Sequence, residues 1–447
     1  MDRFTKQILV LGAGRSASAL IAYLLKQCQQ NGWKLVVGDV YIDSIRHRLA
    51  GQSHVELIQL DADSHAVRQE AIQQSDFVIS MLPPPFHHEV AAECLAAGKS
   101  MATASYVAPE IQELSADFAA KGLLFLGEMG LDPGIDHMSA MQEIHAIQAN
   151  GGILTAFYSH TGGLVAPASD DNPWHYKISW NPRNVVLAGQ STAQFIVDGA
   201  YRFVPYNRMF VNPIPLNVPP YGEFEVYPNR DSLMYRELYG LPQIPTLMRG
   251  TIRKAGFCAG WDAIVRLGLQ DPSHAIVHSS DLTYREWIDG YLPQGDESIS
   301  IRTARFLDLK PDDPVMHQLE WLGLFSDQKI PVDNASPASI LEDLIIRKWK
   351  LQPEDLDLIV MQHVFEYKLN GQNFRKTSSL AIVGEDSINT GMSKTVGLPL
   401  GIFAKLYLQG KIELAGVQIP VIPAIYVPVL AELEANGIHF VENEISI

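Results

Sequence analysis

Cysteines, basic residues and long apolar runs are all scarce in this sequence. The three cysteines, Cys28, Cys94 and Cys258, are odd in number and far apart, so no disulfide framework and no cysteine metal site are predicted. The 34 Lys and Arg residues against 50 Asp and Glu residues give a net charge of −16. This balance argues against a nucleic-acid partner or an anionic membrane surface, because neutralising phosphates requires a basic face.

No apolar run approaches the roughly 18 residues of a membrane span. The first apolar run, Ile8–Leu11, is too short for the core of a signal peptide. We therefore expect a cytoplasmic protein with reduced cysteines. The remaining composition, 47% hydrophobic and 19% charged residues over 447 positions, is ordinary for a folded chain of two or three domains.

Short apolar runs alternate with amphipathic segments through the first third of the chain. The predicted strands are Gln7–Leu11, Lys34–Asp39, Val55–Leu60, Phe77–Leu82, Lys99–Ala104 and Leu123–Gly127. The predicted helices are Arg15–Gln30, Ser44–Ala50, Ser64–Gln74, Phe86–Ala97 and Pro109–Lys121. Strands that are apolar on both faces are typical of a parallel sheet covered by helices. The sequence therefore predicts an α/β fold with a Rossmann-type, doubly wound parallel sheet.

The pattern changes after about residue 130. Asp132-Pro133 is predicted to be an N-cap with proline at N1, opening a helix through about Ala149. Strand-like segments follow at Ile153–His160, Lys177–Trp180, Phe224–Tyr227, Asp357–Lys368 and Phe374–Val383. Asn370-Gly371, between the last two, indicates a hairpin. These segments predict a second α/β domain with a mixed or antiparallel sheet.

Helical spacing returns later in the chain. The helical segments are Ile301–Leu307, Val315–Leu322, Ser336–Trp349 and Ser393–Leu408. The first three predict a helical insertion between about residues 258 and 350. Pro420–Pro428 carries three prolines, which predicts an extended segment.

A glycine-rich loop follows the first predicted strand. In Gly12-Ala13-Gly14-Arg15-Ser16-Ala17, Gly12 permits a tight turn, Gly14 lets a pyrophosphate approach the backbone, and small Ala17 allows close helix packing. The next helix offers free N–H groups to a diphosphate. The alternative is a turn without a ligand, but the position of the motif within a βαβ series favours dinucleotide binding.

Asp39 ends the second predicted strand, where an acid can bind both ribose hydroxyls. Its carboxylate would repel a 2′-phosphate and so favours NAD over NADP. The alternative is a turn or cap aspartate, and Arg46 or Arg48 could still reach a 2′-phosphate. Ligands of such sheets lie beyond the carboxyl ends of the strands. That rule adds the candidates Asp61, Ala62, Ser80–Leu82 and Thr103–Ser105.

Ten segments, in this order, resemble the saccharopine dehydrogenase family of the glutamate-forming type. They are Val78–Pro83, Ala104–Val107, Gly130–His137 (GLDPGIDH), Gly162–Leu164, Asp171–Pro173, Tyr176–Trp180, Tyr227–Ser232 (YPNRDS), Arg249–Arg253, Lys394–Pro399 and Gly416–Pro420. The resemblance implies oxidation of saccharopine with NAD(P)+ to L-glutamate and 2-aminoadipate 6-semialdehyde in lysine metabolism, or the reverse. It also implies a homodimer. The implied domains are a Rossmann domain of residues 1–131 completed by 391–447, a substrate and dimerisation domain of 132–257 and 351–390, and a helical domain of 258–350.

The resemblance also implies the residues of the site. Those for the cofactor are Gly12, Ala13, Gly14, Arg15, Asp39, Asp61, Ala62, Ser80, Thr103, Ala104, Leu131, Asp132, Pro133 and Trp180. Those for the substrate are Ala104, Ser105, Asp132, Arg230, Thr251, Ile252 and Arg253. NADP-using members often have a basic residue just after the second strand, where this chain has Asp39-Val40-Tyr41.

The implied substrate carries three carboxylates and a secondary amine. Arginine suits it, because the planar fork binds a carboxylate through two parallel N–H bonds. Arg230 and Arg253 are the candidate clamps, and the alternative for each is a surface salt bridge. The amine must lose a proton before hydride leaves, and the resulting imine must be attacked by water, so one positioned base could serve both steps.

Asp132 is the candidate base, because its loop lies beyond the last predicted strand of the sheet. The cap interpretation of Asp132 remains equally open. Asp136 and His137 are interpreted as capping and packing residues, and Tyr106 as either a substrate contact or a packing residue. Hydride transfer requires no metal, and none is predicted.

Two other functions remain open. A related amine dehydrogenase, of the lysine ε-dehydrogenase or carboxynorspermidine synthase type, would handle fewer carboxylates. A non-catalytic nucleotide-binding regulator would keep the glycine loop but lose the catalytic motifs, which are present here.

Overall fold

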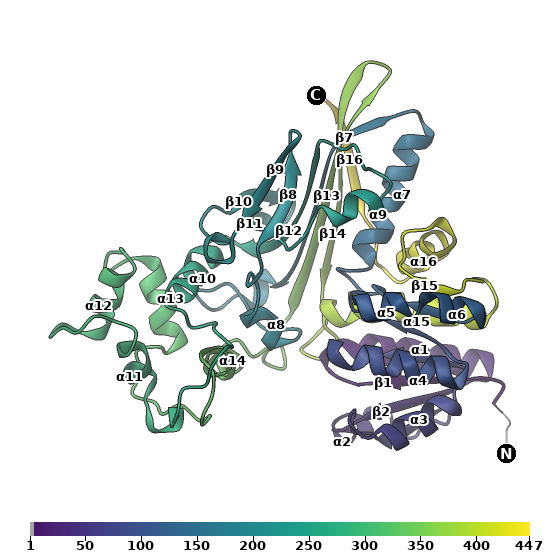
Figure 1. Cartoon of the computed structure of the whole chain (residues 1–447), viewed down its shortest axis with the longest axis horizontal. Coiled ribbons are helices and arrows are strands. Elements are labelled where there is room, and N and C mark those ends of the chain that lie inside the picture. The colour runs from purple at the N-terminus through teal and green to yellow at the C-terminus, as the bar shows by residue number, and fades with distance from the viewer. Residues whose placement is uncertain (1–3) are drawn as a thin grey trace. The chain divides into compact units, whose positions relative to one another are not determined.

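The computed structural model describes residues 4–447. The chain divides into two compact units. The first unit holds the residues up to 153 together with 384–441, and the second holds 154–383 with 442–447. Each unit has its own sheet (Figure 1). The division places the helix after residue 134 in the first unit, whereas the predicted boundary at 131 assigned it to the substrate domain.

The first unit contains a seven-stranded sheet in which every pair of neighbours is parallel. Its strands are β1 (Gln7–Leu11), β2 (Lys34–Asp39), β3 (Val55–Gln59), β4 (Phe77–Ser80), β5 (Ser100–Thr103), β6 (Leu124–Leu126) and β15 (Gly416–Gln418). Their order is β15-β6-β5-β4-β1-β2-β3. The order 3-2-1-4-5-6 is that of a doubly wound dinucleotide-binding sheet. The predicted fold class is confirmed.

The helices of the first unit include layers on both faces of this sheet. They are α1 (Ser18–Asn31), α2 (Asp43–Arg46), α3 (His65–Gln73), α4 (His87–Ala97), α5 (Pro109–Glu113), α6 (Ser115–Ala120), α7 (Ile135–Ala149), α15 (Gly391–Leu408) and α16 (Pro423–Ala435). One core joins the sheet to α3, α4, α5 and α6 through buried residues such as Leu9, Ile72 and Val90. On the other face α15 packs against α1, and the Phe77 ring of β4 contacts Phe403. None of the helices formed by residues 4–447 combines the length and apolar character needed to cross a bilayer.

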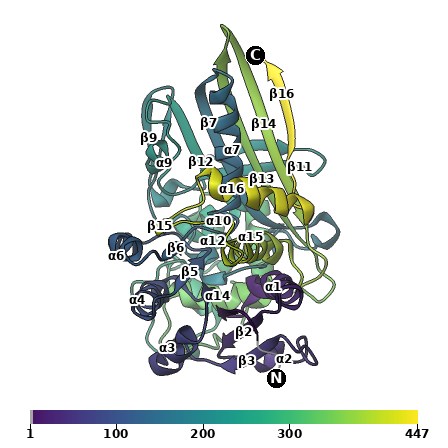
Figure 2. The same ribbon diagram turned by 90° about the vertical axis from the view of Figure 1, so that its right-hand side faces the viewer.

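The second unit contains a nine-stranded mixed sheet. Its strands are β7 (Ile153–Val165), β8 (Ala193–Val197), β9 (Ala200–Val204), β10 (Ile214–Val218), β11 (Gly222–Pro228), β12 (Thr246–Lys254), β13 (Asp357–Leu369), β14 (Gln372–Val383) and β16 (Val441–Ser446). β12 pairs with β7 in parallel and with β11 in antiparallel orientation. The predicted hairpin is confirmed, because Asn370 and Gly371 both have positive φ between β13 and β14. Figure 2 shows this long hairpin with β16 beside β14.

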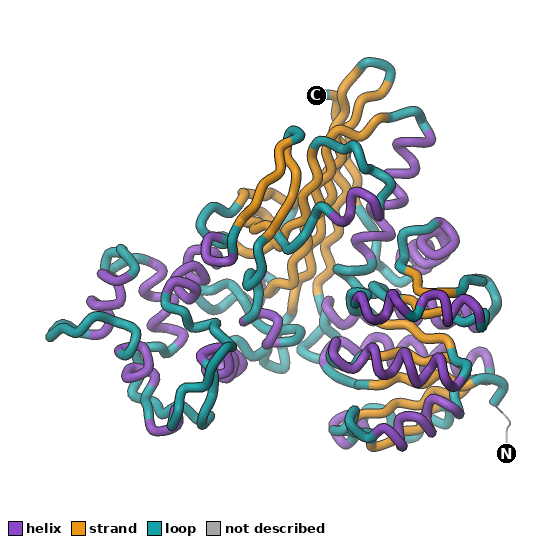
Figure 3. Tube along the Cα trace, viewed as in Figure 1, coloured by secondary structure: helices purple, strands orange, loops and turns teal. Residues whose placement is uncertain are grey.

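Helices and loops alone fill the segment between β12 and β13 (Figure 3). They are α10 (Phe257–Arg266), α11 (Tyr284–Asp289), α12 (Ile299–Phe306), α13 (Pro314–Leu322) and α14 (Pro337–Lys348), and α8 (Pro182–Val186) and α9 (Met234–Leu238) precede them. Ser336 caps α14 by accepting a hydrogen bond from the Ser339 N–H. A core rich in tryptophan, including Trp174, Trp261 and Trp349, holds this helical part together.

Two predicted elements are wrong. Lys177–Trp180 is a loop with one isolated bridge, between Ile178 and Lys350. The buried Lys177 ammonium there lies 2.8 Å from the carboxylate of Asp355, a pairing that local β-propensity does not anticipate. Pro420–Pro428 is not extended throughout, because α16 begins at Pro423. Proline is favoured at that first helical position, since its missing N–H would have no helical partner.

Candidate active site

The glycine loop lies between β1 and α1 as predicted. Gly12 has φ +94°, and a Cβ there would lie 3.0 Å from the carbonyl of Met81, so only glycine fits this turn. A Cβ at Gly14 would meet nothing within 4 Å, so a ligand can approach that backbone. Within residues 4–447, no side chain caps the turn Arg15–Ala17 or the start of α1, and a helix start of this kind suits a diphosphate. These features fit a dinucleotide.

Asp39 lies at the carboxyl end of β2, beside this loop. Its Oδ2 accepts a hydrogen bond from the Ala13 N–H at 2.6 Å, and its Oδ1 accepts one from the Tyr41 N–H at 2.7 Å. The Asp39 side chain therefore stabilises a turn, which was the alternative to ribose binding. It also places a carboxylate against the glycine loop. Arg46, one of the two arginines that could reach a 2′-phosphate, lies 2.9 Å from Asp43.

The loop after β3 contains the candidates Asp61 and Ala62. The Asp61 carboxylate accepts a hydrogen bond from the Asp63 N–H at 3.1 Å. The carbonyl of Ala62 accepts one from the buried guanidinium of Arg68, which also pairs with Glu93 at 2.6 Å. Sequence reasoning missed Arg68, because its partner lies 25 positions away on another helix.

A buried histidine joins the candidates after β4 and β5. The Nδ1 of His87 lies 3.0 Å from Ser80 Oγ. Its Nε2 lies 2.8 Å from Ser105 Oγ and 3.3 Å from Thr103 Oγ1. Burial lowers the pKa of His87 to about 4, so the ring is neutral at pH 7. Sequence reasoning missed this residue, although its place at the first turn of the helix after β4 was a usable signal.

The loop after β6 folds against the loop after β5. The Met129 N–H donates to the Thr103 carbonyl at 3.0 Å, and a Cβ at Gly130 would lie 3.0 Å from the Cβ of Ala104. The Tyr106 hydroxyl donates to Asp132 Oδ1 at 3.3 Å. The first unit therefore brings Ala104, Ser105 and the half-buried Asp132 together at the carboxyl edge of its sheet. Leu131 and Pro133 are buried in the same loop.

Asp132 does not cap the following helix, so that prediction is wrong. α7 begins at Ile135, and its N-cap is Gly134. The carboxylate of Asp136 accepts the Gly134 N–H at 2.6 Å, which gives Asp136 the local role expected of it. The Gly130 N–H donates to the Pro133 carbonyl at 2.9 Å, so the proline belongs to a tight loop and lies outside the helix.

A buried carboxylate–imidazole pair lies beside the loop that follows β6. Glu128 Oε2 lies 2.8 Å from His137 Nε2, and Glu128 Oε1 accepts the Val107 N–H at 3.2 Å. Glu128 was not among the predicted residues. Its position directly before the GLDPG segment gave no local hint that its partners would lie on α7 and in the loop after β5.

The other candidates belong to the second unit. Arg253, on β12, is buried at 3% exposure. Its guanidinium lies over the rings of Tyr176, Phe257 and Tyr227, at 5.2, 5.3 and 5.6 Å from their centroids. One guanidinium nitrogen donates to the Ile252 carbonyl at 2.9 Å, whereas Nε has no hydrogen-bond partner within residues 4–447. Within residues 4–447, no carboxylate forms a salt bridge with Arg253.

The remaining second-unit candidates differ in exposure. Thr251 is half-buried on the same face of β12 as Arg253, whereas Ile252 points to the opposite face and is fully buried. Arg230 is exposed in the loop after β11, with φ +46°. Trp180 donates its indole N–H to the Tyr176 hydroxyl at 3.0 Å. Thr161, paired with Thr251 across the sheet, has a buried hydroxyl that finds no hydrogen-bond partner in the described part of the chain, and it was not predicted.

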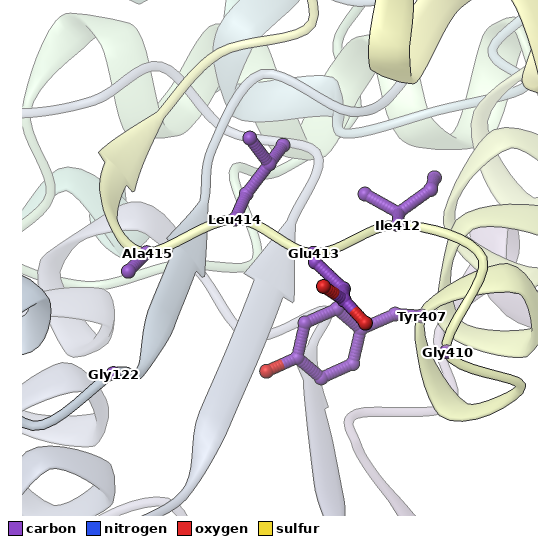
Figure 4. Close-up of a pocket in the computed structure, with 7 residues that line it drawn as sticks. All are labelled: Gly122, Tyr407, Gly410, Ile412, Glu413, Leu414 and Ala415. Carbon is purple, nitrogen blue, oxygen red and sulfur yellow. The ribbon is translucent and has the colours of Figure 1, made fainter.

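A cavity of about 490 Å³ lies in the first unit, away from these residues. It is lined by Gly122, Tyr407, Gly410 and the segment 412–415 (Figure 4). Gly122 and the segment 412–415 precede β6 and β15, so the cavity is at the amino ends of these strands. Cofactors of such sheets bind at the opposite edge, so this cavity is not the candidate site.

Comparison with protein-family models shows to which family the chain belongs. A model described as "Saccharopine dehydrogenase NADP binding domain" matches residues 8–126, and one described as "Saccharopine dehydrogenase C-terminal domain" matches residues 130–438. The chain belongs to the saccharopine dehydrogenase family. The resemblance read from the sequence is thereby confirmed, and with it an NAD(P)-binding domain.

Individual relatives agree with this family. "Saccharopine dehydrogenase [NADP(+), L-glutamate-forming]" of Saccharomyces cerevisiae is 32% identical, over 99% of this chain and 100% of its own length. The Pyricularia oryzae protein of the same name is 33% identical over the same shares. The solved structure of apo saccharopine dehydrogenase (L-Glu forming) from S. cerevisiae has a TM-score of 0.89 and 29% identity, covering 98% of this chain and all of its own.

A longer relative matches as well. "Alpha-aminoadipic semialdehyde synthase, mitochondrial" of Mus musculus is 32% identical over 97% of this chain. The chain spans 47% of the length of that relative, so the similarity concerns about half of the mouse protein.

Proposed function

We propose that the protein oxidises saccharopine with NAD(P)+ to L-glutamate and 2-aminoadipate 6-semialdehyde, and catalyses the reverse reduction. The observation that carries this proposal is the end-to-end similarity to the yeast and fungal dehydrogenases, which leaves no large part of either chain unmatched. The buried Arg253, a cation that forms no salt bridge within residues 4–447, adds a chemical reason. Such a cation suits a substrate that brings its own carboxylates.

The cofactor residues proposed here are those at the carboxyl edge of the first sheet, with Trp180 from the second unit. The glycine loop 12–15 and the start of the helix that follows it would hold the diphosphate, and Asp39 the adenosine ribose. The loops at 61–62, 80, 103–104 and 131–133 would line the rest of the dinucleotide. When bound, the nicotinamide supplies the hydride acceptor.

The protein's own groups would hold the substrate and move its protons. Arg253 and Arg230 would bind carboxylates, with Thr251, Ala104 and Ser105 as further contacts and Ile252 contributing its backbone only. Asp132 would take the proton from the secondary amine, because a protonated amine has no lone pair to expel hydride. Once that proton has passed to solvent, the same carboxylate would take a proton from the water that attacks the imine carbon.

An activity screen tests the function directly. Purified protein with saccharopine and NAD+ or NADP+ is expected to produce the near-ultraviolet absorbance of reduced nicotinamide and to release glutamate. Lysine and carboxynorspermidine serve as the competing substrates, because related dehydrogenases act on amines with fewer carboxylates. Turnover of either in preference to saccharopine would transfer the proposal to that class, and silence with all three amines would leave a nucleotide-binding regulator.

We propose further that NAD is preferred over NADP, unlike in the relatives whose names specify NADP(+). The Asp39 carboxylate, held against the glycine loop by the Ala13 N–H and fixed on its other oxygen by the Tyr41 N–H, would repel a 2′-phosphate. Two like charges at 4 Å repel by about 1 kcal/mol in water and about 4 kcal/mol near a protein surface. That range corresponds to a preference of about 5-fold to several-hundred-fold.

Substitution of Asp39 tests the preference. Asp39→Asn removes the charge but keeps one oxygen acceptor for a loop amide, and Val40→Arg adds a cation at an exposed neighbour. The pair is expected to raise the ratio of kcat/KM for NADP to that for NAD by about tenfold or more. Val40→Arg alone is the matched control and should have the smaller effect. An unchanged ratio in the double variant would remove Asp39 from the ribose site.

The remaining proposals concern the domains, the oligomeric state, the partners and the cellular location of the protein. We expect the three predicted domains, a homodimer and a small-molecule substrate, with no nucleic-acid or membrane partner. The proposed setting is the reducing cytoplasm, a choice supported by the free, buried state of Cys28, Cys94 and Cys258. Burial raises the pKa of each of these thiols, which keeps them protonated and unreactive.

A further inference from the structure

Three side chains form a hydrogen-bonded series across the ends of β4 and β5. His87 lies in the middle, with Ser80 Oγ 3.0 Å from its Nδ1 and Ser105 Oγ 2.8 Å from its Nε2. Ser80 and His87 are buried, at 0% and 2% exposure, whereas Ser105 is half-buried. The series therefore runs from the interior of the first unit to the edge where the candidate substrate residues lie.

The buried end of the series sets the direction of its hydrogen bonds. A neutral imidazole has one N–H donor and one acceptor nitrogen. The Ser80 hydroxyl is fully buried, and among the hydrogen bonds of residues 4–447 its only acceptor is His87 Nδ1. Because a buried hydroxyl proton without an acceptor is destabilising, Ser80 donates to Nδ1. The ring proton is then on Nε2.

The exposed end of the series follows from this tautomer. The Nε2–H points to Ser105 Oγ at 2.8 Å, while Thr103 Oγ1 is more distant, at 3.3 Å. Thr103 Oγ1 also accepts the Ser105 N–H at 3.3 Å, which fixes the backbone beneath the serine. The Ser105 oxygen therefore accepts from His87, and its own proton is available to an acceptor outside the series.

We propose that His87 is a positioning residue that holds the Ser105 hydroxyl as a hydrogen-bond donor to a carboxylate of the bound amino acid. The inference rests on the proposed function, which places Ser105 at the substrate. It gives Ser105 a defined role: a hydroxyl whose oxygen already accepts a hydrogen bond can offer only its proton strongly, and this selects a carboxylate over an ammonium group. His87 stays neutral and buried, and it touches neither substrate nor cofactor.

The tautomer is measurable without any substrate. Long-range proton–nitrogen NMR spectra of the ¹⁵N-labelled protein distinguish the two imidazole tautomers, and His87 is assigned by the signal lost in His87→Gln. We expect the Nε2–H form. The Nδ1–H form would reverse the series, turn Ser105 into a donor to His87, and overturn the proposal.

Kinetics test the consequence for the substrate. His87→Phe retains a ring of similar volume without hydrogen bonds, and it is expected to raise the saccharopine KM by about tenfold with little change in kcat or in cofactor affinity. Ser105→Ala should give a similar rise, and the double variant no further rise, because both remove one contact. His87→Gln should recover part of the loss, since its amide N–H can donate to Ser105.

The matched control is His88→Phe, at the exposed neighbouring position, which should leave KM within twofold. Additive effects of His87→Phe and Ser105→Ala, or a fall in thermal stability with unchanged KM in both His87 variants, would contradict the proposal. An inactive parent enzyme would contradict the proposed function alone, because the tautomer is decided independently.

Discussion

Arg253→Met is expected to raise the saccharopine KM by about 30- to 4,000-fold, the range that corresponds to the roughly 2–5 kcal/mol lost when one partner of a buried charge pair is removed. The guanidinium is enclosed by the rings of Tyr176, Tyr227 and Phe257 and has an Nε without a partner. A cation enclosed in this way is poorly solvated, so a substrate carboxylate that reaches it gains a strong, directional contact.

The same substitution is expected to leave stability unchanged or improved. A buried cation without a salt bridge destabilises the folded state, and methionine fills similar space between the rings without a charge. Thermal unfolding of Arg253→Met should therefore occur at or above the temperature of the parent. A residue that serves only the fold would show the reverse, with lower stability and an unchanged KM.

Two further variants isolate the clamp. Arg253→Lys keeps the charge but loses the planar fork, and its KM should lie between those of the parent and Arg253→Met. Lys254→Met removes a cation from the next position of β12, on the opposite face, where Lys254 lies over Phe224. The KM of that control should be unchanged. A rise as large as that of Arg253→Met would indicate a general loss of positive charge.

Sequence patterns were sufficient where each structural signal is local. Apolar runs separated by amphipathic helices define the first sheet, and the spacing of the glycines after β1 identifies the dinucleotide loop. Both signals depend only on residues a few positions apart. Asn370-Gly371 likewise defines its hairpin within two residues, since both must adopt positive φ. The rule that ligands lie beyond the carboxyl ends of strands then nominated Ser80 and Thr103, which do lie there.

The misinterpreted segments are those whose conformation depends on distant partners. Lys177 pairs with Asp355, 178 positions away, and this contact replaces the strand that local composition favours. His87 has the same dependence, because its partners Ser80 and Ser105 come from the ends of two strands. No periodicity or motif reports such contacts. They arise only when the sheet brings its strand ends together, which is also why binding residues concentrate at that edge.

Asp132→Asn is expected to lower kcat by about 10²- to 10⁴-fold, the usual contribution of a positioned acid or base. Asparagine has nearly the same shape, and its carbonyl oxygen can still accept the Tyr106 hydroxyl, but it takes up no proton at neutral pH. The cap role that would have explained a loss of folding belongs to other residues, since Gly134 precedes α7 and Asp136 binds its N–H. The free energy of unfolding should therefore change by less than about 1 kcal/mol.

Asp136→Asn is the matched control, four positions along the same segment. Asp136 is buried at 1% exposure and holds the Gly134 N–H at the start of α7, so its replacement should lower thermal stability more than it lowers kcat in the molecules that remain folded. The two variants are thus expected to have opposite effects. Asp132→Asn removes the proton acceptor without destabilising the fold, and Asp136→Asn destabilises the fold without removing the proton acceptor. Equal losses of stability in both, with kcat per folded molecule unchanged in Asp132→Asn, would refute Asp132 as the base.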